Sequence, residues 1–289
     1  MAEKVRVGNV EITNAKDAEF RMAAGVFLRN AQGGELTRDD LRPYIGDADP
    51  MEPEESRVST FVVRSQGKTI LVDAGVGAWG LWRFGDGHLL DSLKALDIAP
   101  EDVDFVVPTH LHLDHVGWNT RPSPNGPVPT FPRARYIFQQ RDWDHYTSDA
   151  FLNNTEGPMP AMMRSAVIPL KDSGLMDLSG PEAKITDEVT LLHTPGHTPG
   201  SVTVLVQSNG ESALLLGDVA HHSAQLTETD WSPIIEVDVD LSRRSRKAVV
   251  DRAVALDAVI AGGHFAASDP VFGRMILFEG RRVWRGVTL

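Results

Sequence analysis

The chain has 289 residues, 42% of them hydrophobic, which is enough apolar material for a sizeable globular core. Its formal net charge of −12 disfavours nucleic acid as a partner, because phosphate binding requires clustered lysine and arginine. The absence of cysteine excludes disulfides and thiolate-bound metal. The first residues lack the apolar stretch of a signal peptide, and no run is long enough to span a membrane, so we expect a cytoplasmic protein without a membrane partner.

Alternating and apolar runs in the first part of the chain predict four strands, at residues 4–12, 24–28, 58–64 and 69–73. The last two are joined by a short turn and form a hairpin. The acidic, proline-containing stretch 34–57 predicts a short helix and a loop. Leucines at helical spacing predict a helix over 88–96.

An aromatic segment containing Trp79, Trp82 and Phe84 follows the strand at 69–73. Such a segment can form one wall of a substrate pocket or pack in an ordinary core, and the sequence leaves both alternatives open. We place these three residues, together with Trp118, among the candidate substrate-binding residues.

Four potential metal ligands occupy six consecutive positions after the apolar run 104–108, namely His110, His112, Asp114 and His115. Alternate side chains of an extended segment point the same way, so His110 and His112 could share one metal ion. Asp114 and His115 could begin a second site beside it. Imidazole and carboxylate suit zinc, iron, cobalt or manganese. With ten histidines in the chain, three within six positions favour metal binding over chance.

The second half of the chain continues the pattern of strands and helices. A strand at 135–138 and a helix at 140–146 precede the stretch 149–180, which is rich in proline and methionine and predicts an insertion with one helix. This insertion, with Met159 and Met163, either covers the metal site or lies at the periphery. Further strands are expected at 189–193, 201–206, 213–216, 258–261, 274–278 and 282–284, and an amphipathic helix at 241–256.

Three more candidate ligands follow predicted strands in this half. His197 lies in the glycine- and proline-rich loop TPGHTPG, and His264 follows two glycines after the strand at 258–261. Asp218 ends the apolar run LLLGD, where burial of a carboxylate is unfavourable unless a cation pairs with it. We therefore predict that Asp218 binds metal.

The order His-x-His-x-Asp-His, His, Asp, His, over residues 58–265, resembles the metallo-β-lactamase superfamily of dinuclear metallohydrolases. The resemblance implies an α/β fold, a four-layer αββα sandwich of two mixed sheets packed face to face with helices outside. It implies one domain over 1–289, with the insertion near 149–180. It also implies two divalent ions, zinc being expected and manganese, cobalt or iron being alternatives. The implied ligands are His110, His112 and His197 for one ion, Asp114, His115 and His264 for the other, and Asp218 as the bridge.

The resemblance further implies a metal-bridging hydroxide as the nucleophile, with Asp114 as a catalytic proton acceptor. Acyl-homoserine lactonases of the superfamily usually carry tyrosine three residues after the bridging aspartate, where this chain has His221. This difference favours the branch of methyl parathion hydrolase and its arylesterase and lactonase relatives. We expect hydrolysis of small lactones or activated aryl esters, with His221 as a catalytic, substrate-facing hydrogen-bond donor.

Several alternatives stay open from sequence. The same metal pair could hydrolyse organophosphate triesters, acyl-homoserine lactones or, as in glyoxalase II, thioesters, although no clear basic glutathione-binding segment is present at the C-terminus. The chain could also be a non-catalytic binding protein, but loss of catalysis normally removes ligands, and all seven are present. The expected partner is a small ester or lactone, and a homodimer is left open.

Overall fold

The computed structural model describes residues 3–287, and within this range the main framework consists of two seven-stranded mixed sheets. The strands of the first sheet are, in spatial order, β1 (Lys4–Val7), β2 (Val10–Met22), β4 (Glu54–Ser65), β5 (Lys68–Val72), β6 (Phe105–Val107), β9 (Arg135–Gln139) and β10 (Met176–Ser179). Those of the second are β11 (Glu182–Lys184), β12 (Val189–His193), β13 (Val202–Ser208), β14 (Glu211–Leu215), β16 (Val259–Ala261), β17 (Phe272–Phe278) and β18 (Arg281–Gly286).

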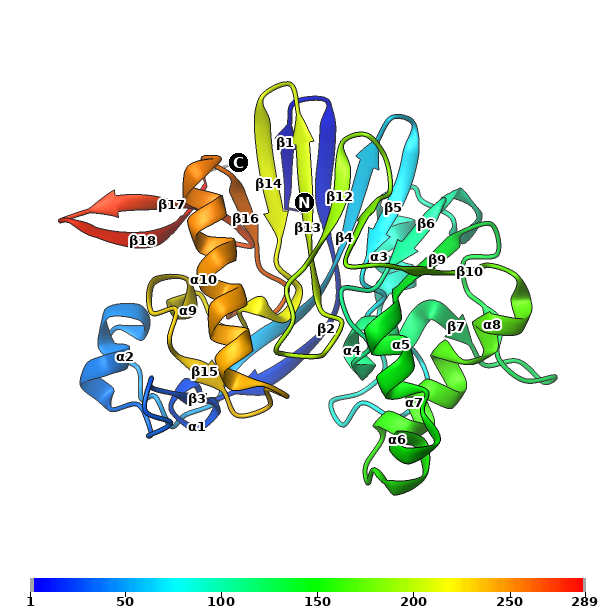
Figure 1. Cartoon of the computed structure of the whole chain (residues 1–289), viewed down its shortest axis with the longest axis horizontal. Helices are drawn as coiled ribbons and strands as arrows, with labels where there is room; N and C mark the ends of the chain where they lie inside the picture. Colours follow the sequence, from blue (N-terminus) through cyan, green and yellow to red (C-terminus); the bar gives the residue numbers. More distant parts are fainter. Residues whose placement is uncertain (1–2, 288–289) are drawn as a thin grey trace.

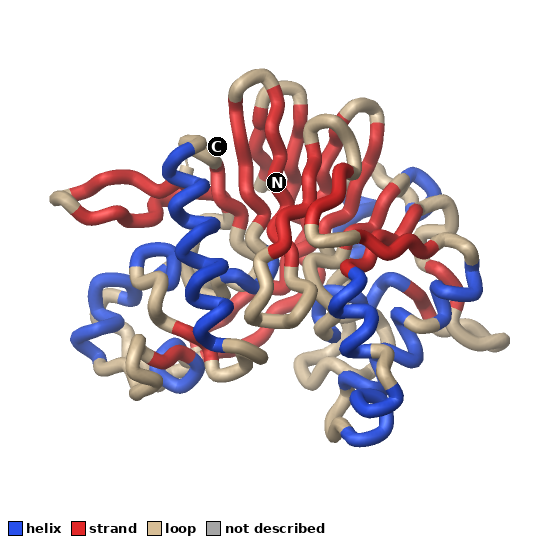
Figure 2. Tube along the Cα trace, in the orientation of Figure 1, coloured by secondary structure: helices blue, strands red, loops and turns tan. Residues whose placement is uncertain are grey.

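The two sheets bury a common apolar layer between them. Phe61, Ile70 and Val107 from the first sheet belong to the same buried cluster as Val204 and Phe272 from the second. The helices lie outside, with strands in the centre and helices on both flanks (Figures 1 and 2). This arrangement confirms the predicted four-layer sandwich with helices on its outer faces.

The outer helices pack against the sheets through their own apolar faces. Leu89 and Leu93 of α3 (Leu89–Ala95) join the cluster on the outer face of the first sheet. Val249, Val250 and Ala253 of α10 (Val239–Ala255) join the cluster on the outer face of the second. The remaining α-helices of the described residues are α1 (Ala24–Phe27), α2 (Arg38–Ile45), α4 (Leu113–Val116), α5 (Gln140–Tyr146), α6 (Asp149–Asn154), α7 (Met159–Met162), α8 (Pro169–Ser173) and α9 (Ala224–Thr227). Within residues 3–287 no helix combines the length and apolar character that crossing a bilayer requires.

Three secondary-structure predictions need correction. The strand expected at 24–28 is wrong, because α1 occupies most of it and is followed by the two-residue strand β3 (Leu28–Arg29), which pairs with β15 (Ser232–Pro233). An apolar run this short has too few residues to distinguish helical from strand periodicity. The strand expected at 4–12 is a hairpin, since Gly8 has a φ of 56° and turns the chain between β1 and β2.

The stretch 149–180 also differs from expectation. It holds α6, α7 and α8 with a π-helical segment at Met163–Val167, rather than one helix. It ends in β10, which pairs in parallel with β9 and so extends the first sheet. Outside the two main sheets, β7 (Thr120–Arg121) and β8 (Val128–Pro129) form a small hairpin.

A buried carboxylate, Asp17, holds the loop between β5 and α3 against β2. The pairing of β2 with β4 shifts register at this residue, and the bulge turns its side chain inward. The backbone N–H groups of Val76 and Leu89 donate to Asp17 at 2.6 and 2.7 Å, and Trp118 Nε1 donates at 2.8 Å. A Cβ atom at Gly75 would collide with this carboxylate, so only glycine fits there.

Candidate metal centre

The candidate ligands meet at one edge of the sandwich because they follow strands that end there. The loop after β6 carries His110 and His112, and α4 carries Asp114 and His115. Asp218 follows β14 and His264 follows β16, and these two strands are parallel neighbours whose carboxyl ends lie at the same edge. His197 joins them from the loop between β12 and β13.

Four of these residues form the first group, namely His110, His112, His197 and Asp218. Each offers a ligand atom, and these atoms all lie within 4.8 Å of one another. His197 Nε2 lies 3.0 Å from His112 Nδ1 and 3.1 Å from Asp218 Oδ2. His110 Nε2 is 3.6 Å from the same carboxylate oxygen.

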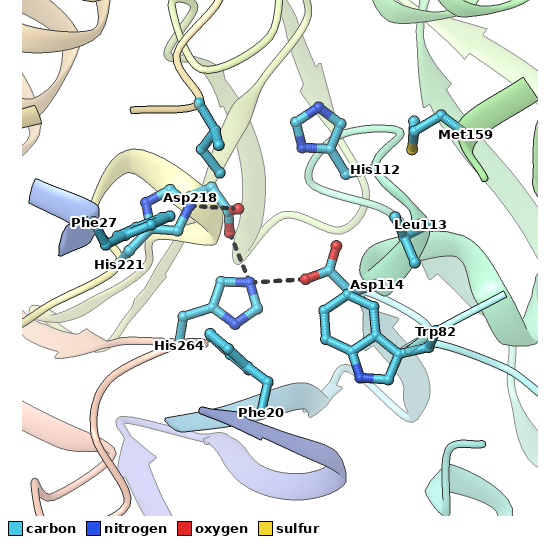
Figure 3. Close-up of a pocket in the computed structure, with 11 residues that line it drawn as sticks. Phe20, Phe27, Trp82, His112, Leu113, Asp114, Met159, Asp218, His221 and His264 are labelled. Atoms are coloured by element: carbon cyan, nitrogen blue, oxygen red, sulfur yellow. Dashed lines mark ion pairs between the residues drawn. The ribbon is translucent and has the colours of Figure 1, made fainter. Parts of the chain in front are cut away.

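Asp114, His115 and His264 form the second group. His264 Nε2 lies 3.1 Å from His115 Nε2 and 3.4 Å from Asp114 Oδ2. Asp218 Oδ1 lies 3.3 Å from His115 Nε2 and 3.2 Å from His264 Nε2, whereas Oδ2 faces His197 and His110, so Asp218 turns one oxygen toward each group. Figure 3 shows the contact between Asp218 and His264.

The chemistry of these donors fits divalent metal ions. His110 Nε2 and Asp218 Oδ1 are buried and make no hydrogen bond of normal geometry with residues 3–287, a state that is unfavourable unless a cation pairs with them. Burial holds the pKa values of His110 and His112 well below the ordinary value, which leaves both rings neutral with lone pairs to donate. Burial alone would raise the pKa of Asp218, but His264 and His115 outweigh it and hold that pKa well below its usual value.

In each of the five candidate histidine ligands, the ring nitrogen that points away from the other candidate ligands makes a contact of its own. The partners are Thr109 Oγ1 for His110 Nδ1 at 3.1 Å, Tyr146 Oη for His112 Nε2 at 2.9 Å, Asp73 Oδ2 for His115 Nδ1 at 3.0 Å, Glu236 Oε2 for His197 Nδ1 at 3.0 Å, and the Arg57 carbonyl for His264 Nδ1 at 3.0 Å. Such contacts fix the orientation and tautomer of metal-binding histidines. Sequence patterns do not reveal four of these partners, Thr109, Tyr146, Glu236 and Arg57, because no local spacing connects the last three to their histidines.

A cavity of about 360 Å³ opens onto both groups. Its polar lining consists of His112, Asp114, Asp218, His221 and His264. Its apolar lining comes from Phe20, Phe27, Trp82, Leu113, Met159 and Ile235, and most of these side chains are visible around the carboxylates in Figure 3. No lysine or arginine of the described residues lines it.

Of the residues predicted to form a pocket wall, Trp82 and Met159 line this cavity, whereas three aromatic residues lie elsewhere. Trp79 packs in the core cluster of the first sheet, and its Nε1 donates to the Gly117 carbonyl at 3.0 Å. Trp118 is buried against Asp17. Phe84 is 41% exposed and contacts Trp82 from outside the cavity, with 5.5 Å between ring centroids. Among the three aromatic residues of the loop after β5, Trp82 is the one that lines the cavity.

His221 lines the cavity beside Asp218, with its Nε2 3.0 Å from Asp218 Oδ2. Its side chain is buried, and its ring meets that of Phe27 edge to face with 5.3 Å between centroids. Its backbone N–H donates to Gln225 Oε1 at 2.9 Å, which fixes the loop. His221 therefore faces the cavity and lies next to the candidate metal ligands.

Comparison with known proteins identifies the family. Residues 53–264 match the metallo-beta-lactamase superfamily. N-acyl homoserine lactonase AttM of Rhizobium radiobacter is 29% identical over 274 residues, covering 90% of this chain and 89% of that protein. N-acyl homoserine lactonase of a Bacillus species is 25% identical over 232 residues, covering 74% of this chain and 84% of that protein. The chain belongs to the metallo-β-lactamase superfamily.

Two solved structures share the fold. Hydrolase AbOPH of the beta lactamase superfamily superposes with a TM-score of 0.82 at 21% identity, covering 100% of this chain and 98% of that chain. AidC, a dizinc quorum-quenching lactonase, superposes with a TM-score of 0.78 at 19% identity and the same coverage. The predicted fold and the predicted class, a hydrolase of this superfamily, are confirmed, and the branch within it stays a prediction.

Proposed function

We propose that this chain hydrolyses small lactones that carry an apolar substituent, at a centre of two divalent metal ions. The observation that carries the proposal is the cavity, in which potential metal ligands lie beside six apolar side chains. N-acyl homoserine lactones become the first candidate substrates, because the two relatives above carry that activity in their names. These relatives favour N-acyl homoserine lactones over organophosphate triesters, two alternatives that the sequence leaves open, and activated aryl esters come second.

In this proposal His110, His112 and His197 bind the first ion, and Asp114, His115 and His264 bind the second. Asp218 is shared between the two ions. Zinc is the proposed metal, and manganese, cobalt and iron accept the same donors. When bound, such a pair of ions activates a water molecule and polarises the carbonyl oxygen of an ester.

Residues that line the cavity provide the other functions, namely proton acceptance, hydrogen bonding to the substrate and binding of its substituent. The Asp114 side chain is 15% exposed and faces the cavity, where it accepts the proton that the attacking water releases. His221 donates a hydrogen bond to the substrate carbonyl. The apolar walls bind the substituent and exclude water, while the lack of lysine and arginine in the described lining disfavours polyanions and glutathione conjugates.

A panel of substrates tests this proposal. The kcat/KM values for N-acyl homoserine lactones and aryl esters are expected to exceed those for phosphotriesters and thioesters by at least about tenfold, because the cavity walls suit uncharged acyl groups. Steady-state kinetics on metal-loaded protein give these values. Higher kcat/KM for phosphotriesters, or no lactone turnover, would overturn the proposal.

His221→Ala is expected to lower kcat/KM for lactones by about 10- to 100-fold, because the transition state loses a hydrogen-bond donor. Metal content, measured by elemental analysis, is expected to stay unchanged. His221→Gln retains a donor and should recover part of the activity. Loss of a metal ion from His221→Ala would mean that His221 is a ligand rather than a substrate contact.

A further inference from the structure

Glu236 is a buried carboxylate in a segment whose neighbouring side chains face solvent. Ile234, Ile235 and Val237 are 56%, 46% and 57% exposed, whereas the Glu236 side chain is 0% exposed. An ionised carboxylate is expensive to bury unless its oxygens are fully paired. The conformation of this exposed segment therefore places one charged group inside.

Both oxygens of Glu236 have charged or polar partners. Oε2 lies 3.0 Å from His197 Nδ1. Oε1 lies 3.0 Å from Arg246 Nη2 and accepts from Ser242 Oγ at 2.6 Å. Arg246 is itself fully buried on α10, and its Nε donates to the Val219 carbonyl, at 2.7 Å, next to Asp218.

The backbone holds the segment in place independently of the carboxylate. The N–H of Val237 donates to the His197 carbonyl at 3.3 Å, and the N–H of Asp238 donates to the Gly196 carbonyl at 2.9 Å. Asp238 also caps α10, since its side chain accepts from the Leu241 N–H at 2.9 Å. The carboxylate of Glu236 is thus not the sole anchor of this segment, and its effect on His197 can be tested separately.

We propose that Glu236 is a positioning residue for the candidate metal centre, because it keeps the proton of His197 on Nδ1 and leaves the Nε2 lone pair free for metal. The inference rests on the proposed function, since it assumes that the first group of ligands holds an ion. A carboxylate behind a metal-binding imidazole also makes that imidazole a stronger donor. The buried guanidinium of Arg246 pairs with Oε1 of Glu236, which leaves Oε2 for His197.

The test compares Glu236→Gln with Ser242→Ala. In Glu236→Gln the side-chain amide can turn its NH2 group toward His197 Nδ1, which then accepts and moves the ring proton to Nε2. We expect the affinity for one of two bound metal ions to fall by about 10- to 100-fold. Ser242→Ala removes a hydrogen bond from the same carboxylate but leaves its contact with His197, and is expected to bind both ions as the unaltered protein does.

Zinc affinity is measured by competition with a chelator, and the cobalt(II) absorption spectrum reports the ligands of the affected ion. Denaturant unfolding of the metal-free proteins gives their relative stability, so that a general loss of structure is recognised. Unchanged metal affinity in Glu236→Gln, or an equal loss in Ser242→Ala, would overturn the assignment and leave the substrate proposal intact. An unaltered protein that binds no pair of metal ions would overturn both.

Discussion

Asp218→Ala is expected to lose both metal ions and to reduce lactone turnover by at least about 10³-fold, because nucleophile activation and carbonyl polarisation disappear together. The physical reason is the position of the carboxylate. Its Oδ2 faces His197 and its Oδ1 faces His115 and His264, so removal affects both groups of ligands. Elemental analysis should find about two ions per unaltered chain and far fewer in the variant.

His222→Ala is the matched control for this prediction. His222 lies on the same loop and is also buried, but its Nε2 is 3.4 Å from Glu54 Oε1 and its Nδ1 accepts from the Ala224 N–H at 3.1 Å. It belongs to neither group of potential ligands. Metal content and turnover close to those of the unaltered protein are expected. Equal losses in both variants would show that the loop, rather than the Asp218 carboxylate, determines metal binding.

Asp17→Ala is expected to lower the free energy of unfolding by about 3–5 kcal/mol, a large fraction of the total stability of a typical domain. The substitution leaves three buried donors without an acceptor, on Val76, Leu89 and Trp118. Asp17 is 1% exposed, so water cannot replace the carboxylate without local opening. Equilibrium urea denaturation of metal-free protein measures the change.

Asp102→Ala is a suitable comparison for Asp17→Ala. Asp102 accepts one exposed hydrogen bond, from the Ala99 N–H at 2.9 Å, and its loss is expected to change stability by less than about 1 kcal/mol. A comparable loss of stability in the two variants would contradict the role given to the buried bulge of β2.

The candidate ligand residues could be recognised in the sequence because each lies just after an apolar run or within a short motif of unusual composition. His110, His112, Asp114 and His115 lie within six positions, and Asp218 and His264 follow strands that the pattern identifies. The structure brings all of them to one edge, as expected. Short sequence patterns are therefore sufficient to identify these candidate ligands.

The cavity walls could not be predicted in the same way. Phe27 and Ile235 are brought together by the pairing of β3 with β15, in which each strand has only two residues. Trp79 and Trp82 are three positions apart in one loop, yet one packs in the core and the other lines the cavity. Tertiary packing decides such orientations, and apolar residue type alone does not reveal them.

The separation between strand-end ligands and cavity walls has a consequence for laboratory evolution of this scaffold. Ile235 and Met159 lie on segments outside the two main sheets, so variation there can reshape the cavity while the strands that precede the candidate ligands stay intact. Substitutions at the ligands themselves would change chemistry and metal loading together. Libraries confined to Phe27, Met159 and Ile235 should therefore yield altered substrate ranges with little loss of folded protein.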